Sequence, residues 1–384
     1  MSDSVGMQAA AGAPSWDVAV VGGGVMGCAT ALFLARGGMK VALLDRGELC
    51  REASGVNAGT LTLNMTRAAL IPYAQAGHRM WMDAENWLGR GVGAVATEGL
   101  SLAFTEAEGE LLEKRAAIRR EHGADIRVID PSRACQVEPG LNPKLLKAAY
   151  CETDGYAAAY LTGRAFRGAL SAAGVSILEY HKVERIDHSD RSFCIDAANK
   201  QPVNARRLVL AGGVWLETML AWLSVDIRIK CLINQLVITE RMRPAMRTVI
   251  SIANGLLSLK QFPNGTVLIG GGWQGLGDPV RGGVETIPEN LIGNMRLAQW
   301  TIPALAQARV ARVWLGLEAE TADALPVIGA VPGVTDAFVI GSVHSGYTSG
   351  PYMGKLLADR ILGHEPAHPL FDPARLLGLA IPAL

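Results

Sequence analysis

The sequence lacks the cysteine patterns that hold metal ions and iron–sulfur clusters. Its six cysteines are scattered and form no CxxC pair: Cys28, Cys50, Cys135, Cys151, Cys194 and Cys231. Closely spaced cysteines supply the ligands of structural zinc and of most clusters, so we predict no metal site. Isolated thiols are typical of a cytosolic protein.

The chain also lacks a net charge and a long apolar run. Its 36 Lys and Arg balance 36 Asp and Glu, so the total charge gives no sign of nucleic-acid or anionic-membrane binding. No stretch is long and apolar enough for a transmembrane helix. Residues 1–14 have neither the basic start nor the apolar core of a secretory signal. We predict a flexible tail over 1–14 in a cytoplasmic protein, which reaches a membrane only through partners.

Glycine, in contrast, is abundant, with 44 among 384 residues. Many glycines indicate tight turns and close backbone approaches, which phosphate-binding loops require and loop-rich folds share. The length exceeds what one simple core usually spans. We therefore expect two closely connected lobes.

A β-α-β unit opens the ordered part of the chain. The β-branched run Asp17–Val21 predicts a strand, a glycine turn follows, and a helix is expected from about Gly24 to Gly37. Lys40–Leu44 predicts the second strand. Residues 51–64 are small or polar and predict a loop.

The remaining chain mixes helices and strands. Helices are expected over 68–90, 107–122, Ala158–Ala173, 286–307 and Pro351–Leu362, the last with proline at its start. Strands are expected over Val175–Tyr180, Val183–Ile186, Ser192–Ile195, Arg207–Leu210, Ile227–Ile233, Leu236–Thr239, Leu257–Phe262, Thr266–Ile269 and Ala337–Ile340. Asn264-Gly265 indicates a hairpin between two of them.

This order predicts an α/β fold with an α+β second lobe. A Rossmann-like nucleotide-binding lobe is assembled from separated pieces, with an inserted substrate lobe on a large mixed, mainly antiparallel sheet. We assign 15–90, 150–220 and 322–384 to the first lobe, and 91–149 and 221–321 to the second.

The strongest local motif is a G-x-G-x-x-G within Val20–Gly27, directly after a strand and at a helix start. Gly22 permits the tight turn, Gly24 lets backbone approach a pyrophosphate, and Gly27 lets helix and strand pack closely. The helix N-terminus then attracts phosphate oxygens. Asp45 ends the next strand about twenty residues on, where a carboxylate accepts hydrogen bonds from a ribose. A glycine turn packed for its own sake would not explain Asp45, so we predict dinucleotide binding.

Several further segments resemble the FAD-dependent D-amino-acid oxidase superfamily, which includes glycine oxidase, sarcosine oxidase and β-type subunits of bacterial amino-acid and opine dehydrogenases. The likeness runs from about Asp17 to Gly363. Besides the glycine loop, it is carried by Ala53–Gly59, Leu208–Trp215, Arg312–Leu317, Thr321, Asp323, Leu325–Gly329, Ile340–Gly346 and Pro351. Ser54–Thr60 is most similar to the dehydrogenase β subunits.

The resemblance implies FAD and hydride transfer from a carbon that bears nitrogen. Val183 stands where relatives contact adenine, and the late turn is expected to offer backbone N–H groups to the flavin. The residues that the glycine motif and the resemblance together assign to the cofactor are Gly22, Gly24, Val25, Met26, Gly27, Asp45, Arg46, Ser54, Asn57, Ala58, Gly59, Thr60, Val183, Ala211, Gly212, Trp215, Gly316, Gly341, Ser342, His344, Ser345, Gly346, Tyr347 and Thr348. An additional FMN is expected only in a heteromeric complex.

Three departures from the family pattern qualify this expectation. Sarcosine oxidases carry a flavin-linking cysteine within this signature, but Trp314–Ala319 holds none, so we expect non-covalent FAD. They also carry a lysine thought to aid oxygen reactivity where our alignment places Leu268, which favours a dehydrogenase. Glycine oxidase has an arginine near His344, so the usual carboxylate clamp is in doubt.

Five residues are candidates for the reaction itself, and each has a structural alternative. His344 and Tyr347 follow the late strand and could face the ring, or serve as a turn residue and a packing residue. Arg312 could bind a carboxylate or pair within the sheet. Trp273 could wall the pocket or fill the core. Thr60, together with Asn64, could line the pocket or satisfy a turn.

The sequence thus predicts FAD-dependent oxidation of a small amino acid, N-substituted amino acid or opine, by a chain acting as a dehydrogenase β subunit. One alternative is an oxidase that passes electrons to oxygen and releases peroxide. Another is a flavin-bearing assembly or electron-relay subunit that oxidises no amine itself. Expected partners are the amine, an electron acceptor and other dehydrogenase subunits. The choice of amine stays open.

Overall fold

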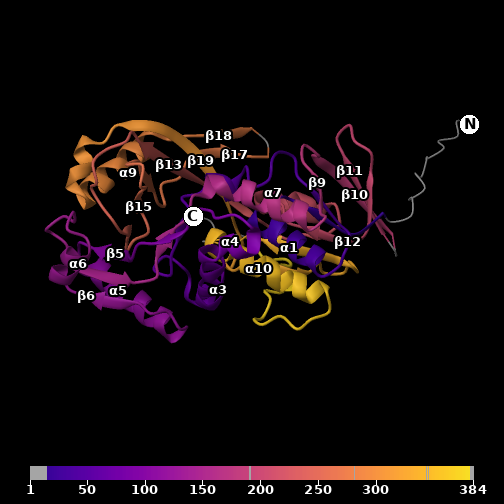
Figure 1. The fold of residues 1–384 in the computed structure, drawn as a ribbon, viewed down its shortest axis with the longest axis horizontal. Coiled ribbons are helices and arrows are strands. Elements are labelled where there is room, and N and C mark those ends of the chain that lie inside the picture. Colours follow the sequence, from indigo (N-terminus) through magenta and orange to yellow (C-terminus); the bar gives the residue numbers. More distant parts are fainter. Residues whose placement is uncertain (1–14, 190–191, 281, 343, 345, 381–384) are drawn as a thin grey trace, which may run out of the picture.

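A computed structural model describes residues 15–189, 192–280, 282–342, 344 and 346–380. Two eight-stranded sheets lie side by side along the long axis of the molecule (Figure 1). The tail expected over 1–14, and Ser345, lie outside the described residues.

The first sheet has the order β10-β11-β12-β1-β2-β9, with β21 beside β12 and β20 beside β21. Its strands are β1 (Trp16–Val21), β2 (Val41–Leu44), β9 (Ser176–Leu178), β10 (Val183–Ser189), β11 (Ser192–Ala197), β12 (Val203–Leu210), β20 (Val327–Ala330) and β21 (Ala337–Gly341). β1 pairs in parallel with both β2 and β12. Its residues from Val18 onward are buried, as expected for a parallel strand covered on both faces.

Helices from distant parts of the chain cover this sheet. Those in contact with its strands are α1 (Val25–Arg36), α7 (Thr162–Ala172), α8 (Leu216–Ala221) and α10 (Gly346–Ile361). Three further helices, α2 (Ala53–Val56), α3 (Ile71–Met82) and α4 (Ala84–Leu88), pack against α7 and α10. α10 crosses α1 so closely that a Cβ on Gly354 would lie 2.6 Å from the Cβ of Ala29. This contact brings the late turn before α10 to the glycine loop before α1.

The second sheet has the order β19-β13-β16-β15-β14-β5-β7-β6. Its strands are β5 (Gly99–Ala103), β6 (Arg127–Ile129), β7 (Lys147–Cys151), β13 (Lys230–Thr239), β14 (Val249–Ile252), β15 (Ser258–Gln261), β16 (Val267–Gly270) and β19 (Val310–Glu320). All neighbours are antiparallel except β14 and β5. Helices α5 (Glu106–Glu121), α6 (Pro131–Val137) and α9 (Pro288–Thr301) pack on it (Figure 1).

Small elements complete the fold. Two small sheets have the orders β3-β8-β4 and β17-β18, with β3 (Thr60–Leu61), β4 (Val95–Ala96), β8 (Gly155–Tyr156), β17 (Leu276–Asp278) and β18 (Gly283–Glu285). Short 3-10 turns are η1 (Ala68–Leu70), η2 (Ala159–Leu161), η3 (Gly213–Trp215), η4 (Pro303–Gln307) and η5 (Pro373–Leu376). The predicted fold class is confirmed, whereas the proposed domain boundaries stay a prediction.

Several expected elements are wrong in detail. The two strands expected over 227–239 are one strand, β13, because β19 pairs with its whole length. The helix expected over 68–90 is divided into η1, α3 and α4, and the loop expected over 51–64 contains α2 and β3. The helix expected over 286–307 ends at Thr301, before Pro303, and continues as η4.

The last helix begins at Gly346, five residues before its predicted start at Pro351. A proline inside a helix removes the hydrogen bond to the carbonyl four residues earlier, here that of Tyr347. The indole Nε1 of Trp81 donates to that carbonyl at 2.7 Å instead. The missing donor is therefore replaced by a side chain of α3, which secures the start of α10.

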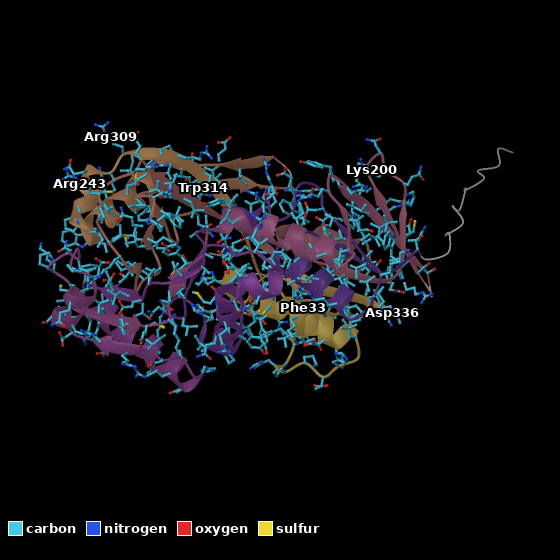
Figure 2. All side chains as sticks on the ribbon, viewed as in Figure 1. Phe33, Lys200, Arg243, Arg309, Trp314 and Asp336 are labelled. Carbon is cyan, nitrogen blue, oxygen red and sulfur yellow. The ribbon has the colours of Figure 1, made fainter. Side chains whose placement is uncertain are left out.

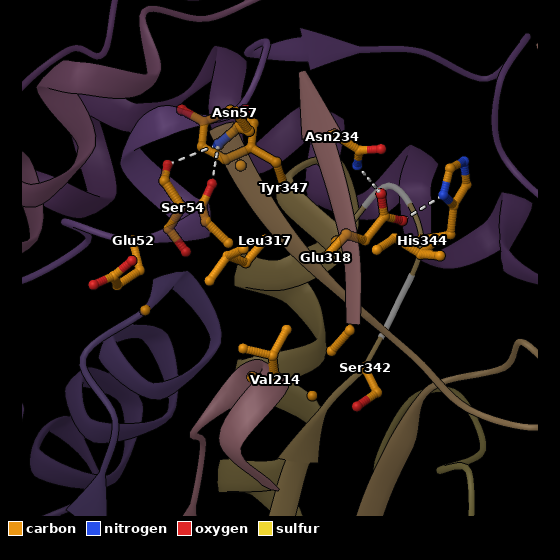
Figure 3. A pocket seen from close by; sticks show the side chains of 18 of the residues that line it. Glu52, Ser54, Asn57, Val214, Asn234, Leu317, Glu318, Ser342, His344 and Tyr347 are labelled. Atoms are coloured by element: carbon orange, nitrogen blue, oxygen red, sulfur yellow. Dashed lines mark hydrogen bonds and ion pairs between the residues drawn. The ribbon is translucent and has the colours of Figure 1, made fainter. Parts of the chain in front are cut away.

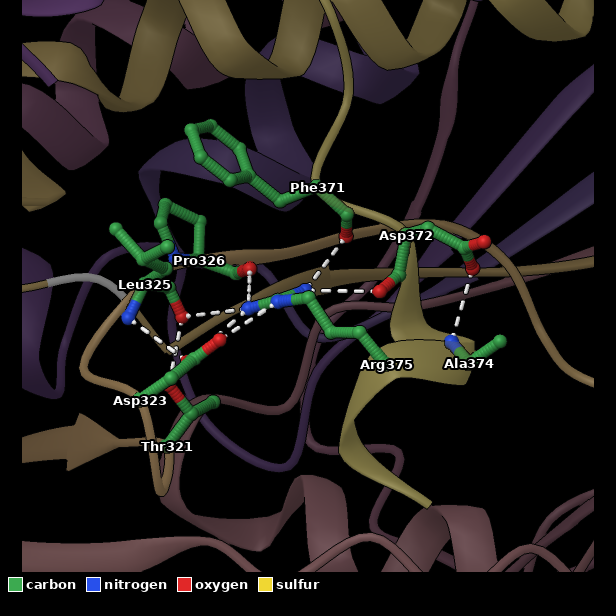
Figure 4. Close-up of polar contacts among 8 residues, drawn as sticks. All are labelled: Thr321, Asp323, Leu325, Pro326, Phe371, Asp372, Ala374 and Arg375. Carbon is green, nitrogen blue, oxygen red and sulfur yellow. Dashed lines mark hydrogen bonds and ion pairs between the residues drawn. The ribbon is translucent and has the colours of Figure 1, made fainter. Parts of the chain in front are cut away.

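The signature residues near position 323 form a structural clamp (Figure 4). Arg375 donates to Asp323, with Nε 2.8 Å from Oδ2, and also to the carbonyls of Leu325, Pro326, Phe371 and Asp372. These bonds hold the segment before β20 against η5. Burial alone would raise the pKa of Asp323, but the contacts with Arg375, the N–H of Leu325 and the hydroxyl of Thr321 together hold that pKa below its usual value.

Candidate active site

One cavity of about 1310 Å³ runs from the glycine loop, past residues 53–60, to the second sheet. Ligand pockets usually enclose about 300–1,000 Å³, so this space can hold a dinucleotide together with a small molecule. Of the residues predicted to contact a cofactor, those that line it are Gly22, Gly24, Val25, Met26, Gly27, Asp45, Arg46, Ser54, Asn57, Ala58, Thr60, Val183, Ala211, Gly212, Trp215, Gly316, Gly341, Ser342, His344, Gly346 and Tyr347. Gly59 and Thr348 lie just behind this wall.

The glycine loop is shaped by two close approaches. Gly22 has φ +113, and a Cβ there would lie 2.3 Å from the carbonyl oxygen of Ala211. A Cβ on Gly27 would lie 1.9 Å from the carbonyl oxygen of Gly22. Gly24 has an ordinary extended conformation at the start of α1 and lines the cavity. The loop thus leaves bare backbone at a helix N-terminus, which suits a phosphate group.

Asp45 closes the nucleotide end of the cavity. Its Oδ2 accepts from the N–H of Gly23 at 2.6 Å, and its Oδ1 accepts from the N–H of Gly47 at 2.8 Å. Burial raises its pKa, and these two hydrogen bonds only partly offset that effect. Each oxygen keeps a lone pair that a ribose hydroxyl can use. Beside it, Arg46 stacks on Trp215 at 3.6 Å.

The loop over 53–60 is fixed by Asn57. Its Oδ1 accepts from the N–H of Gly59 at 2.6 Å, and its Nδ2 donates to the carbonyl of Ser54 at 2.8 Å (Figure 3). Gly59 has φ +67 and abuts the carbonyl of Ala157. Ser54 in turn accepts from the N–H of Val25 at 2.9 Å, which ties this loop to the glycine loop.

The late turn lines the opposite wall. Ser342 has φ +55, and its buried hydroxyl has no hydrogen-bond partner among the described residues. The hydroxyl of Tyr347 instead meets Thr162 at 2.7 Å, and its ring stacks on Trp81 with centroids 4.7 Å apart. Burial raises the pKa of this phenol. Tyr347 therefore serves the packing role that was its alternative, and Ser342 keeps hydrogen-bonding capacity for a ligand.

A half-buried carboxylate that the sequence analysis did not single out joins this wall. Glu318 on β19 lies between two side chains: its Oε1 accepts from Nδ1 of His344 at 2.5 Å, and its Oε2 accepts from Nδ2 of Asn234 at 2.8 Å (Figure 3). Burial alone raises its pKa, but His344, Asn234 and the nearby Arg67 together hold the pKa below its usual value. Glu318 is thus an anion inside the cavity.

Three arginines line the end of the cavity in the second lobe: Arg67, Arg115 and Arg119. Nη2 of Arg67 lies 3.5 Å from Glu320, while its buried Nη1 has no hydrogen-bond partner within the described part of the chain. Burial and the neighbouring Arg115 lower the pKa of Arg119 to about 10. This region therefore favours an anionic group.

A second missed residue, Lys260 on β15, is fully buried behind the loop over 53–60. Its Nζ donates to the carbonyl of Ala58 at 2.7 Å and to Oγ1 of Thr60 at 2.5 Å. Burial lowers its pKa to about 7. Lys260 is the cross-strand partner of Leu268. Leu268 stands where our alignment places the lysine of sarcosine oxidases. This chain instead carries a lysine, Lys260, on the neighbouring strand.

Two predicted catalytic residues do not reach the cavity. Arg312 is exposed on β19, six residues before Glu318, which corresponds to roughly 20 Å along a strand. Trp273 donates to the carbonyl of Leu256 at 2.7 Å and packs against Gly293, outside the lining. Neither side chain is thus among those that line the cavity. Thr60 and Asn64 do line it.

Within the described ranges, no group of three or more His, Cys, Asp or Glu side chains could hold a metal ion. Of the helices that the structure describes, none has the length and apolar character needed to cross a membrane.

Comparisons with known proteins agree with this geometry. A family model described as "FAD dependent oxidoreductase" (DAO) matches residues 17–360. The B subunit of opine oxidase from Rhizobium meliloti is 25% identical over 90% of this chain and 93% of its own length. The beta subunit of sarcosine oxidase from an Arthrobacter species is 25% identical over 94% and 90%. The crystal structure of glycine oxidase from Geobacillus kaustophilus superposes with a TM-score of 0.84 at 26% identity, over 94% of this chain and 98% of that one.

Proposed function

The chain belongs to the DAO family of FAD-dependent oxidoreductases and acts on CH–NH or CH–NH2 groups of amino acids or amines, and we propose that its own substrate is a small N-substituted or cyclic amino acid or an opine. One observation carries the proposal: a single cavity joins the nucleotide loop to an end lined by Glu318, His344 and Arg67. The cofactor and a small charged substrate thus fit in one continuous space.

The residues present fit FAD. Bare backbone at Gly24 and the start of α1 suits the pyrophosphate, Asp45 suits the adenosine ribose, and the unpartnered hydroxyl of Ser342 suits a flavin polar atom. When bound, FAD supplies the acceptor for the hydride that leaves the carbon next to nitrogen. No cysteine lies within Trp314–Ala319, so we propose non-covalent binding. None of the comparisons supports an FMN site in this chain.

The end of the cavity that is lined by Arg67, Arg115 and Arg119 suggests how the substrate is oriented. Arg67 has a buried, unpartnered Nη1 and lies close enough to Glu318 to affect its pKa. A guanidinium is well suited to a carboxylate. We assign Arg67 to the substrate carboxylate, with Arg119 supporting the positive potential, and Arg312 no longer has a part in binding.

The electron acceptor separates two candidate functions. Relatives named as subunits of opine and sarcosine oxidases support a chain that works with other subunits. Leu268, at the position where sarcosine oxidases carry a lysine, supports the first candidate, a dehydrogenase. Lys260 supports the second candidate, an oxidase, because a buried cation beside the flavin loop stabilises the negative charge that develops when oxygen is reduced.

The test is an anaerobic screen of the purified, FAD-loaded chain with glycine, sarcosine, D-alanine, both proline enantiomers and octopine, read as bleaching of the flavin absorbance. Bleaching by one class of amine supports the proposal and names the substrate. Peroxide release under air would identify the oxidase. Tight FAD binding without bleaching by any amine would instead support a relay role.

A further inference from the structure

The pair Glu318 and His344 has the arrangement of an oriented acid–base group. Glu318 is an anion and can only accept, so Nδ1 of His344 must carry the proton of their 2.5 Å hydrogen bond. Neutral imidazole holds one ring proton, which leaves Nε2 with a lone pair. Among the described residues, Nε2 has no hydrogen-bond partner. His344 lines the cavity with its side chain 38% exposed.

The second oxygen of Glu318 is also restrained. Asn234 on β13 donates to Oε2 at 2.8 Å, and its own Oδ1 accepts from Nε2 of Gln274 at 2.6 Å. A carboxylate held on both oxygens keeps the imidazole in one orientation, since the ring can rotate only by breaking its bond to Oε1. The network therefore presets the direction of the free Nε2.

The other charged or titratable groups described around the pair are not suited to accept the proton of the substrate. Arg67 donates only and is paired with Glu320. Burial, together with Asp278 and Glu318, raises the pKa of Cys231 to about 11, so its thiol stays protonated at neutral pH. Lys260 is directed at Ala58 and Thr60 on the far side of the loop. Within the described lining around the pair, His344 is thus the group with a free nitrogen lone pair that can accept a proton.

We propose that Nε2 of His344 accepts the proton from the substrate ammonium and that Glu318 is the positioning residue that aims it. The inference rests on the proposed function, because it needs an amine substrate. The N–H bond of the ammonium breaks, an Nε2–H bond forms, and no electrons leave the substrate in this step. The amine lone pair that results can stabilise the cation that forms at carbon when hydride departs. The negative Glu318 stabilises the imidazolium until its proton passes to water.

The test compares His344→Asn, Glu318→Gln and a control, Glu240→Gln. Glu240 is an exposed carboxylate just after β13, remote from the cavity. Equal FAD content and far-UV circular dichroism establish that each variant is folded. The anaerobic rate of flavin bleaching by the best amine of the screen is then measured between about pH 5.5 and pH 10.

In the wild type and the control, we expect rapid bleaching already at pH values below the pKa of the amine in water, because His344 removes the ammonium proton. In His344→Asn, only free amine reacts, so the rate rises only as the pH approaches the pKa of the amine in water. The rate near pH 7 falls about 10²-fold, within the usual range for general base catalysis, and recovers near pH 10. Glu318→Gln gives a smaller loss, about 10-fold, with the same displacement of the profile.

A second readout needs no turnover. In ¹⁵N-histidine NMR of the FAD-loaded protein, the His344 resonances, assigned from their loss in His344→Asn, should show the proton on Nδ1 in the wild type and a mixture of tautomers in Glu318→Gln. A proton on Nε2 in the wild type, or an unchanged pH profile in His344→Asn, would overturn the inference while amine oxidation stands. Failure of every amine to bleach the wild type would overturn both.

Discussion

The two ends of the cavity differ in the groups that form them: mainly backbone at one end and side chains at the other. The nucleotide end is backbone: a glycine loop, a helix start and one carboxylate, all supplied by β1, α1 and β2 within one short stretch. The substrate end is side chains: Glu318, His344 and Arg67, brought together from three distant segments. A backbone site depends on shape, whereas a side-chain site depends on charge and pairing. Substitutions should therefore have different effects at the two ends.

The largest effect is expected at the backbone end. Gly24→Val places branched carbons where the pyrophosphate would lie, since even a Cβ there comes within 3.2 Å of Oγ of Ser54. Its φ of −72 suits valine, so the fold should persist. We expect FAD affinity to fall by more than about 10²-fold, or over 2.7 kcal/mol, measured as flavin bound per chain. Gly168→Ala, whose new Cβ lies in open space on α7, is the control and should bind FAD normally.

At the side-chain end, Arg67→Met should leave FAD binding intact and weaken the binding of the substrate. Loss of a charged hydrogen bond to a carboxylate costs about 1.5–3 kcal/mol, so KM should rise about 10–10²-fold with little change in kcat. Arg312→Met, on the exposed part of β19, is the control and should match the wild type. Equal effects of both substitutions would contradict the assignment of Arg67.

Lys260 lies behind the loop over 53–60, between the two ends of the cavity. Its substitution tests whether this lysine promotes the reaction of the reduced flavin with oxygen. Its pKa of about 7 means that it is a cation below neutral pH and loses its charge as pH rises. Reoxidation of the reduced flavin by oxygen should therefore slow as pH increases through 7. Lys260→Met should lower that rate about 10-fold at pH 6 and remove the pH dependence, as stopped-flow absorbance would show. Lys200→Met is a surface control (Figure 2). A flat wild-type profile would exclude this role.

The smallest effect on the cofactor and the reaction is expected outside the cavity, at the clamp of Arg375. Arg375→Met leaves several carbonyls without their donor, which should lower the free energy of unfolding by about 1–3 kcal/mol in urea titrations. The depressed pKa of Asp323 contributes stability above the unfolded pKa, and this is lost as pH falls through the folded value. The variant should therefore show a shallower acid-induced loss of stability. FAD binding should hardly change.

The same contrast explains what the sequence could predict. The glycine motif and Asp45 lie within about twenty residues, and their roles follow from local geometry, so the nucleotide end was identified. The α/β class followed from the order of the hydrophobic runs. Glu318 follows the apolar run Val313–Leu317 and could have been noticed there, but its contacts with His344 and Asn234 depend on the tertiary fold.

Lys260 and Arg67 were missed for a related reason. Nothing in the residues around Lys260 shows that its side chain is buried, because burial depends on the loop over 53–60 packing on β15. Arg67 follows that loop in sequence, yet it reaches Glu318 only because β19 passes beside it. Arg312 was chosen for its place in a signature, although the strand carries it beyond the cavity.

The crossing of α10 over α1 has a consequence for how the protein matures. The ribosome makes the glycine loop early, but Gly341, Ser342, His344 and Tyr347 of the facing wall emerge only after the whole second sheet. A nascent chain therefore has no complete flavin pocket until β21 and α10 have left the exit tunnel and docked. We therefore expect the cofactor to bind only after α10 has docked, and proteolytic loss of α10 to release it.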